Sequence, residues 1–482
     1  MEAGGCRRSA TTRKRKSAAL MGEGSPAPSP AAAPDPGAAD HDGGGDGRDL
    51  HLSDLPDDVL RKIISVLPMK QRGRTQILAK RWLPLWRSLP LNIDCCEIAR
   101  SNHGKLGDVL QRIISSHQGD CHRFCIRPLL ATNKENDAAV DACLLSPALN
   151  KLKELEFYRR PWHNWQRLPA PTSIFRFSHT LCVAQFGHCT LTDDIVQGLH
   201  FPQLKKLGLD YVFLSEFSLS SMIASSPSLE VLLIIRCSGA RCLRINSFTL
   251  RSIEVGNSSP DPCMEELIIE SAPHLERLFH LDQNQDLHVS VLSAPRLESL
   301  GCCTNSTRLV FGSTDIHQGP RIAIGSLSTA LCRIKSLHLC MRTLCLDMVI
   351  ELMRCFPCLE KLYIQCEKSG TKNLWRRKHR DLLRSFDIRL KKIVLDCYRA
   401  KKPDIDFVTF FVLNARVLES MTVLVKRNDE EFLAKQRQKL LLESKASDGA
   451  EINFVLKDID VSSKLVYGGV ATPQRILNKL VI

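Results

Sequence analysis

Cysteine is the residue type whose spacing in this chain most nearly matches a metal site. The segment CFPC at residues 355–358 places two cysteines three positions apart, and Cys340, Cys345 and Cys366 are close in the sequence. A structural zinc site usually needs two such pairs at defined spacing, and a second pair at that spacing is missing. Cysteine is also a common small core residue. The sequence therefore predicts no metal site and no cofactor, with these cysteines filling a core.

Catalysis by the chain itself is not indicated by any motif. The sequence contains no glycine-rich phosphate loop, no Gly-x-Ser-x-Gly turn and no His-Glu-x-x-His helix. Those patterns would indicate a nucleotide site, a hydrolase or a zinc protease. A cysteine nucleophile would need an activating base, and the sequence alone assigns none. We therefore predict that the protein is not an enzyme.

The net charge of +14 is concentrated in two windows. Residues 51–90 hold eight basic and three acidic side chains, and residues 372–402 hold twelve and three. The rest of the chain is balanced, so nucleic acid is not the expected partner of the whole protein. The run KNLWRRKHRDLLR, which begins the second window, has one tryptophan and no interleaved aromatic residues. A solvated helix face is the favoured interpretation, and an anion or nucleic-acid site at 372–402 is the alternative.

The first 50 residues are rich in Ala, Gly, Pro, Ser and Asp. They cannot bury enough apolar surface to fold, so we expect a disordered tail. Within it, Arg13–Lys16 is either a nuclear-import sequence or a solubilising charge cluster. The chain shows no secretory signal and no apolar run long enough for a membrane helix. The expected location is the nucleus, the cytoplasm or both, where most of the 20 cysteines would stay free.

Residues 51–90 predict a compact helical module. Pro56 suits the first turn of a helix, apolar residues follow at a spacing of three to four, and Pro68 ends the pattern. A second helix carries Ile77, Leu78 and Trp82. About forty residues are too few for a well-buried independent core. The surplus of apolar positions favours a docking face, and the alternative is that these residues only close the module on itself.

A repeat follows the helical module. The unit Pro-x-Leu-x-x-Leu starts at Pro147, Pro202, Pro227, Pro273, Pro295 and Pro357. Strand motifs of the form Leu-x-x-Leu-x-Leu begin at Leu204, Leu229 and Leu250, which are 25 and 21 residues apart. This is the spacing of leucine-rich repeats, with one strand in each unit, rather than of an ordinary α/β core. Residues 241–312 lack a helical pattern, so short strands or extended loops are expected there.

The last patterned segment, residues 386–456, predicts strand, helix, strand, helix and strand. Leu390-x-x-Ile393-x-Leu395 repeats the register of the preceding strands, as does the segment that begins at Leu418. This segment therefore looks like two further repeats with longer helices. The last unit of a repeat array must cover the open end of its core, so we expect it to act as a cap.

Two segments resemble known families. The phrases LSDLPDDVLRKIISVLP, RTQILAKRW and LPLW resemble the F-box, and FFVLNARVLE resembles the FBD domain, so the chain resembles the plant F-box, leucine-rich-repeat and FBD proteins. The resemblance implies an α/β solenoid: a small helical F-box, a curved repeat array and a C-terminal α/β cap. The expected boundaries are a tail at 1–50, the F-box at 51–90, the repeats at 91–385, the FBD domain at 386–460 and a second tail at 461–482.

The same resemblance implies a function. An F-box docks the small acidic adaptor of cullin–RING ubiquitin ligases, so the chain is expected to be a non-catalytic substrate-recognition subunit that binds an unknown target protein. The alternatives are an interaction scaffold that no longer recruits a ligase, and the anion-binding or nucleic-acid-binding repeat protein described above. The predicted adaptor-binding residues are the apolar ones of the F-box: Leu55, Pro56, Val59, Leu60, Ile63, Ile64, Leu67, Leu78, Trp82 and Trp86.

The target-binding residues are predicted from the strand register. In a Leu-x-x-Leu-x-Leu strand the leucines point inward and the residues between them point outward. Repeat proteins commonly bind partners on the face that those outward residues form. The predicted set is Lys206, Asp210, Arg277, His338, Lys361, Tyr363 and Gln365.

Overall fold

A computed structural model defines the fold. It divides the chain into two compact units, residues 1–54 and 55–482, and the described residues all lie in the second. The tails, Pro68, Arg13–Lys16 and the basic run at 372–384 lie outside the described residues, so predictions about them stay predictions. The described residues are 55–67, 69–101, 106–126, 134–159, 167–256, 264–280, 287–303, 307–312, 314–316, 331–370, 387–396, 398–427 and 429–456.

Three short helices form the N-terminal module. They are α1 (Asp57–Val66), α2 (Met69–Thr75) and α3 (Trp82–Ser88). The first begins after Pro56, whose carbonyl accepts hydrogen bonds from the backbone N–H groups of Val59 and Leu60. Two aspartates in its first turn interact favourably with the helix dipole. The predicted helical module is confirmed, but Ile77 and Leu78 lie in the turn between α2 and α3 rather than on one helix with Trp82.

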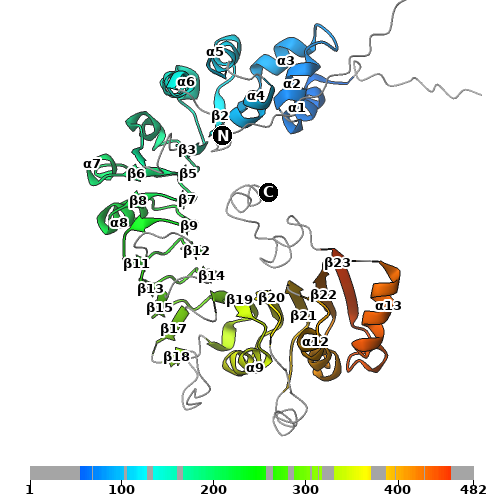
Figure 1. Cartoon of the computed structure of the whole chain (residues 1–482). Helices are drawn as coiled ribbons and strands as arrows, with labels where there is room; N and C mark the ends of the chain where they lie inside the picture. The colour runs from blue at the N-terminus through cyan, green and yellow to red at the C-terminus, as the bar shows by residue number, and fades with distance from the viewer. Residues whose placement is uncertain are drawn as a thin grey trace, which may run out of the picture. The chain divides into compact units, whose positions relative to one another are not determined.

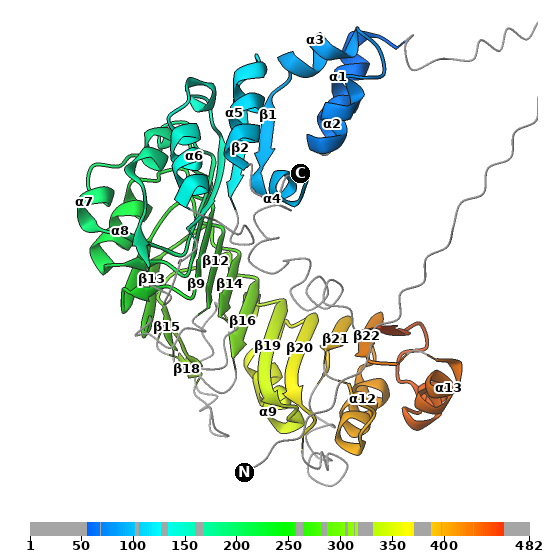
Figure 2. The same ribbon diagram turned by 45° about the horizontal axis from the view of Figure 1, so that its top comes forward.

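A single parallel sheet of 14 strands runs from residue 91 to residue 456 (Figure 1). Each strand pairs with the one before it and the one after it in the repeat order, as Figure 2 shows for β9 to β22. The strands are β1 (Leu91–Asp94), β2 (Cys121–Ile126), β3 (Glu154–Tyr158), β5 (Val183–Gly187), β7 (Lys206–Asp210), β9 (Val231–Ile235), β12 (Ser252–Gly256), β14 (Arg277–His280), β16 (Ser299–Cys303), β19 (Ser336–Thr343), β20 (Lys361–Lys368), β21 (Lys392–Asp396), β22 (Ser420–Val425) and β23 (Glu451–Leu456).

Helices and short strands connect the main strands. Figure 1 shows α7, α8, α9 and α12 on one side of the sheet. The helices are α4 (Cys95–Ser101), α5 (Leu106–Ser116), α6 (Lys134–Leu144), α7 (Asp193–Val196), α8 (Glu216–Ala224), α9 (Leu346–Cys355), α12 (Lys402–Asn414) and α13 (Glu430–Lys439). Short 3-10 turns occur at η2 (Pro147–Leu149), η3 (Thr172–Phe177), η4 (Leu331–Arg333) and η5 (Leu442–Ser444).

Two smaller sheets replace helices in part of the outer layer. The first contains β4 (Leu168–Pro169), β6 (Cys189–Leu191), β8 (Phe213–Leu214) and β10 (Ser238–Gly239). The second contains β11 (Cys242–Asn246), β13 (Glu266–Ser271), β15 (Leu287–Val291), β17 (Thr307–Phe311) and β18 (Thr314–Ile316). Every regular element described between residues 241 and 312 is a strand, which confirms the expectation for that segment.

One continuous core runs through the repeats and the C-terminal segment. Leu207, Leu232, Ile253 and Leu278 occupy equivalent positions on four neighbouring strands, and all are buried. The same row continues to Ile393 on β21, in the C-terminal segment. The leucine register is therefore confirmed, and the C-terminal strands extend the same sheet. The curvature of the array stays a prediction.

Candidate functional site

Four of the predicted adaptor-binding residues are not on the surface. Leu60 and Ile64 of α1 and Trp82 and Trp86 of α3 are buried together in the centre of the helical module. A module this small must pack its apolar stripe on its own helices, so the alternative that these residues close the module is correct for them. Trp86 also contacts the ring of His117 edge-on at 4.8 Å, which joins the module to the repeats.

Other apolar residues of the module remain exposed. Leu78 is 63% exposed, and Val59 and Pro56 are exposed as well. The prediction missed two further ones, because they do not continue the buried stripe: Val66 is 80% exposed and Ile77 is 85% exposed. The remaining predicted residues, Leu55, Ile63 and Leu67, are half-buried. Exposed apolar side chains on so small a module provide a candidate docking surface.

The second candidate surface is the face of the large sheet opposite the core leucines, which we call the ladder face. Its residues alternate along each strand with core residues, as Lys206 and Asp210 alternate with Leu207 and Leu209. The predicted register is therefore correct for this strand. The register does not decide exposure. Equivalent residues on neighbouring parallel strands lie side by side, so their side chains can cover one another.

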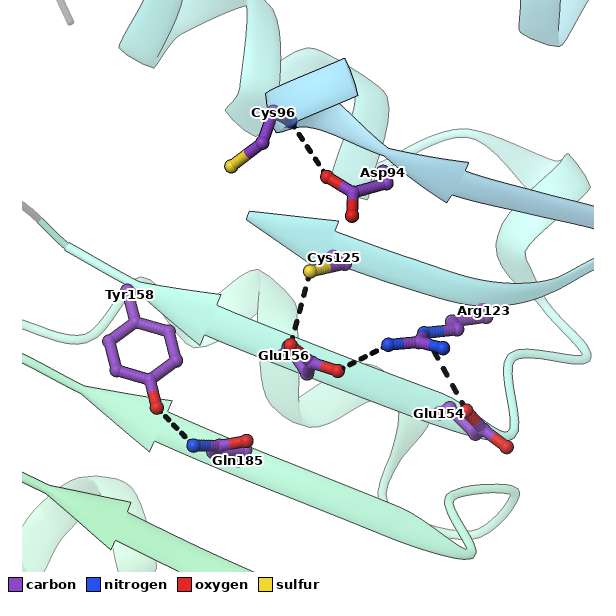
Figure 3. Close-up of polar contacts among 8 residues, drawn as sticks. All are labelled: Asp94, Cys96, Arg123, Cys125, Glu154, Glu156, Tyr158 and Gln185. Atoms are coloured by element: carbon purple, nitrogen blue, oxygen red, sulfur yellow. Dashed lines mark hydrogen bonds and ion pairs between the residues drawn. The ribbon is translucent and has the colours of Figure 1, made fainter. Parts of the chain in front are cut away.

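At the N-terminal end of the ladder face, charged groups bond to one another within the chain (Figure 3). The guanidinium of Arg123 lies 2.6 Å from a carboxylate oxygen of Glu156 and 3.7 Å from one of Glu154. The thiol of Cys125 donates a hydrogen bond to the other oxygen of Glu156 at 3.2 Å. The amide of Gln185 donates to the hydroxyl of Tyr158 on the neighbouring strand. These bonds make this network structural.

Asp210 and Lys206 do not present free charges, contrary to the prediction. Both side chains are buried. The guanidinium Nη2 of Arg236 donates to both carboxylate oxygens of Asp210, at 2.6 and 2.8 Å. Burial lowers the pKa of Lys206. Lys206 lies between Val183 and Val231 on the neighbouring strands, and the Arg236 side chain covers Asp210.

Turns at the ends of three successive strands show an unusual backbone. His188, Tyr211 and Arg236 directly follow β5, β7 and β9, and all three have a positive φ, between 52° and 58°. Non-glycine residues seldom adopt this conformation. It places the rings of His188 and Tyr211 4.9 Å apart, and the guanidinium of Arg167 lies over the Tyr211 ring at 4.4 Å. The sequence pattern gave no signal for this cluster.

His338 and Tyr363 are also wrongly predicted as exposed. They are 4% and 6% exposed, and their rings stack with centroids 4.2 Å apart. Phe279 meets the other side of His338 edge-on at 4.9 Å. β16 lies between the strands of Phe279 and His338 and carries Gly301 at this level. No side chain therefore separates the rings of Phe279 and His338. The three aromatic residues therefore form a packed row rather than a binding surface.

The basic and polar residues of the C-terminal half remain accessible. Lys361 is exposed, and Arg277 and Gln365 are half-buried. Lys392, which the prediction did not include, lies opposite Lys361 on the next strand. A pocket of about 820 Å³ opens beside Arg277, and it is lined by Glu276, Arg277, Pro295, Arg296, Glu298, Ser299, Cys332, Arg333, Lys335, Cys358 and Glu360.

The described residues contain neither a metal-ion cluster nor a membrane-spanning helix. No three His, Cys, Asp or Glu side chains there are placed to hold a metal ion. Fourteen described cysteines are free thiols, most of them buried, and Cys366 is in a disulfide. Cys355 illustrates the buried type, since burial raises its pKa to about 12. None of the described helices is long and apolar enough to span a membrane.

Comparison with known proteins matches three parts of the chain to family models. Residues 52–94 match the F-box domain, and residues 379–423 match the FBD domain. Residues 140–364 match the leucine-rich repeats described for the FBD-associated F-box protein At5g56370. The matched segments follow the order helical module, repeat array and C-terminal strands.

Individual relatives from Arabidopsis thaliana agree with the domain matches. The putative F-box/FBD/LRR-repeat protein At5g22610 is 29% identical over 261 residues, covering 52% of this chain and 48% of the relative. The FBD-associated F-box protein At5g60610 is 25% identical over 400 residues, covering 77% of this chain and 99% of the relative. F-box/LRR-repeat protein 13 is 25% identical over 237 residues, 47% of this chain and 51% of the relative. The chain thus spans about half the length of the first and third, and nearly all of the second.

Proposed function

The chain belongs to the plant family of F-box, leucine-rich-repeat and FBD proteins, and from this premise we propose that it is the substrate-recognition subunit of an SCF-type cullin–RING ubiquitin ligase. F-box proteins with leucine-rich repeats are typically non-catalytic, and no enzyme family matches. In this role the F-box binds the acidic adaptor and the repeats hold a target protein. Holding the target near the ubiquitin-charged enzyme raises its effective concentration there.

The observation that carries this proposal is the surface of the F-box. Ile77 and Leu78 are strongly exposed although the module has a closed core of its own. Apolar side chains that are accessible on a folded module gain free energy when a partner covers them. The family match supplies the kind of partner.

The charge of the F-box supports an acidic partner. Its aspartates are occupied within the module, since Asp57 pairs with Arg81 and Asp58 pairs with Arg61. Lys62 and Arg74 have no carboxylate within ion-pair distance among the described residues. The module therefore presents net positive charge, which favours encounter with an acidic adaptor.

Co-purification with the adaptor tests the proposal. Replacing Ile77 and Leu78 with Asp should abolish recovery of the adaptor, because two charges would enter an apolar interface. Phe248→Asp provides the matched control, since Phe248 is 71% exposed and lies in the repeats. Equal recovery of the adaptor with the wild type and the double variant would contradict the proposal. It would favour the alternative of a scaffold that recruits no ligase.

We also propose a nuclear and cytoplasmic location, on the basis of Arg13–Lys16. Deleting residues 1–20 from a fluorescent fusion should shift the protein toward the cytoplasm if this cluster directs import. An unchanged distribution would leave Arg13–Lys16 as a solubilising charge cluster.

A further inference from the structure

We propose that a row of basic and hydroxyl side chains on the C-terminal half of the ladder face binds an extended acidic segment of the target protein. This inference rests on the proposed function, because it names the chemistry of the target. We call the row the cationic rail. It runs through the first ladder position of six neighbouring strands, from β14 to β22: Arg277, Ser299, Ser336, Lys361, Lys392 and Ser420.

The side chains of the rail do not stabilise the sheet, because they place positive charges together without acidic partners among the described residues. None of its six positions holds a carboxylate. Lys361 lies directly opposite Lys392 on the adjacent strand, and like charges in that relationship destabilise a sheet. An acidic group from outside the chain would remove this repulsion.

The ion pairs around the rail leave its cations unmatched. The three glutamates that line the neighbouring pocket are each paired with another cation: Glu298 with Lys335 at 3.0 Å, Glu276 with Arg251 at 3.7 Å and Glu360 with Lys391 at 3.2 Å. Five described cations in and beside the rail have no carboxylate at ion-pair distance among the described residues: Arg277, Arg296, Arg333, Lys361 and Lys392.

Arg277 has an unsatisfied hydrogen-bond donor. Its Nε atom is buried and has no hydrogen-bond acceptor in the structure. A buried donor without an acceptor destabilises the free protein, and an acceptor from a bound ligand would remove that cost. Arg277 also lines the pocket of about 820 Å³, together with Arg296 and Arg333. An acidic side chain entering this pocket would meet three guanidinium groups.

The dimensions of the rail fit a peptide better than a single small anion. Neighbouring strands lie about 4.8 Å apart, so the four spacings from Arg277 to Lys392 span about 19 Å. An extended chain advances about 3.3 Å per residue, so about six residues would cover this distance. The rail is therefore long enough to contact several acidic side chains of one segment.

The aromatic residues beside the rail argue against nucleic acid as its ligand. Binding of single strands combines cations with accessible rings on which bases stack. Tyr363 and His338 lie next to the rail, but they are stacked on each other and almost fully buried. Lys392 itself lies over the Tyr363 ring at 6.0 Å. The rail thus offers charge and the hydroxyls of Ser299 and Ser420 without a stacking platform, while the hydroxyl of the buried Ser336 is bonded to His338.

A peptide-binding measurement on the full chain tests the proposal. The probe is a fluorescent ten-residue peptide of alternating Glu and Gly, and its neutral counterpart has Gln in place of Glu. Wild-type protein should bind the acidic peptide more tightly, with an affinity that falls as salt rises. The double variant Lys361→Gln, Lys392→Gln should weaken acidic-peptide binding by roughly tenfold while leaving the neutral peptide unaffected.

The matched control is Arg241→Gln with Arg244→Gln, which removes the same charge from β11 and the residue before it. Both arginines are exposed, and both pair with glutamates, Glu265 and Glu270. This variant should bind the acidic peptide like the wild type. An equal loss in both variants would reduce the effect to net charge, and tighter binding of a single-stranded oligonucleotide of the same charge would identify nucleic acid as the ligand. Either result would overturn the proposal.

The two proposals fail separately. The rail variant should still co-purify with the adaptor, because its substitutions are distant in sequence from the F-box. The Ile77 and Leu78 variant should still bind the acidic peptide. Peptide binding without adaptor recovery would reject the ligase role but keep the rail, and adaptor recovery without peptide binding would do the reverse.

Discussion

The two halves of the ladder face use the same strand positions in different ways. From β2 to β9, the charged groups are paired or buried within the chain: Arg123 pairs with Glu156, Asp210 accepts hydrogen bonds from Arg236, and Lys206 is buried. From β14 to β21, Lys361 and Lys392 face each other without a carboxylate among the described residues. Since the backbone register is the same, the difference lies in side-chain chemistry. The first half stabilises the sheet, and the second keeps unmatched charge available for a partner.

The largest expected effect concerns the aromatic row of the second half. Tyr363→Ala removes a buried ring that stacks on His338, so it should lower the free energy of unfolding by about 3 kcal/mol. Urea denaturation measures this. Tyr363→Phe, which keeps the ring, should change stability by under about 1 kcal/mol. A fully stable alanine variant would mean that the row is not part of the core.

The next largest effect on stability is expected at Arg123, in the half of the ladder face from β2 to β9. Arg123→Ala leaves the buried carboxylate of Glu156 without its cation, and we expect a loss of about 2 kcal/mol, reduced by the partial exposure of Arg123. Thermal or urea unfolding checks the value. The double variant Arg123→Met, Glu156→Gln should recover most of the loss, since it removes both charges together. If the single variant is as stable as the wild type, the network of Figure 3 is not structural.

A smaller, pH-dependent effect on stability is expected from Glu254, on the strand between the two halves. Glu254 on β12 lies between Leu233 and Phe279, and Arg277 is two residues before Phe279 on β14. Burial raises the pKa of Glu254 from 4.5 to about 7. The folded state therefore holds a proton that the unfolded state releases, and stability falls as pH rises from about 4.5 to about 7.

A shift of this size corresponds to roughly 3 kcal/mol, but the Glu254 side chain is partly exposed, so solvent screening should reduce the loss of stability to about 1 kcal/mol. Urea unfolding at pH 5 and pH 8 measures it, and Glu254→Gln should remove that part of the pH dependence. An unchanged pH slope in the variant would show that Glu254 is solvated in the folded protein.

The smallest effect on stability is expected at the rail. Lys361→Gln with Lys392→Gln should leave the free energy of unfolding unchanged or raise it by about 0.5 kcal/mol, because two like charges no longer face each other. The same unfolding experiment measures it. A clear destabilisation would place these lysines with the matched charges of the first half, and the contrast between the halves would disappear.

The outcome for the predicted surface residues shows why a strand register alone does not predict exposure. The pattern placed Tyr363 on the face opposite Leu362 and Ile364, which is correct. It could not show that His338 would stack on Tyr363, because His338 belongs to a strand 25 residues earlier in the sequence. In the F-box, the helical spacing of Leu60 and Ile64 indicated an apolar stripe. It did not indicate whether other helices or a partner would cover that stripe.

The sequence by itself determined the repeat, the strand register, the order of F-box, repeats and FBD segment, and the absence of a recognisable catalytic motif. The repeat and the strand register follow from local periodicity, since each strand of the array buries every second side chain, whereas the F-box and FBD assignments follow from the family resemblance. Only the tertiary structure decided which charges are matched and which are free. Arg123 meets Glu156, and Lys361 meets Lys392, through strand pairing between residues 31 or more positions apart. Because those neighbours arrive from different repeats, no local pattern contains them.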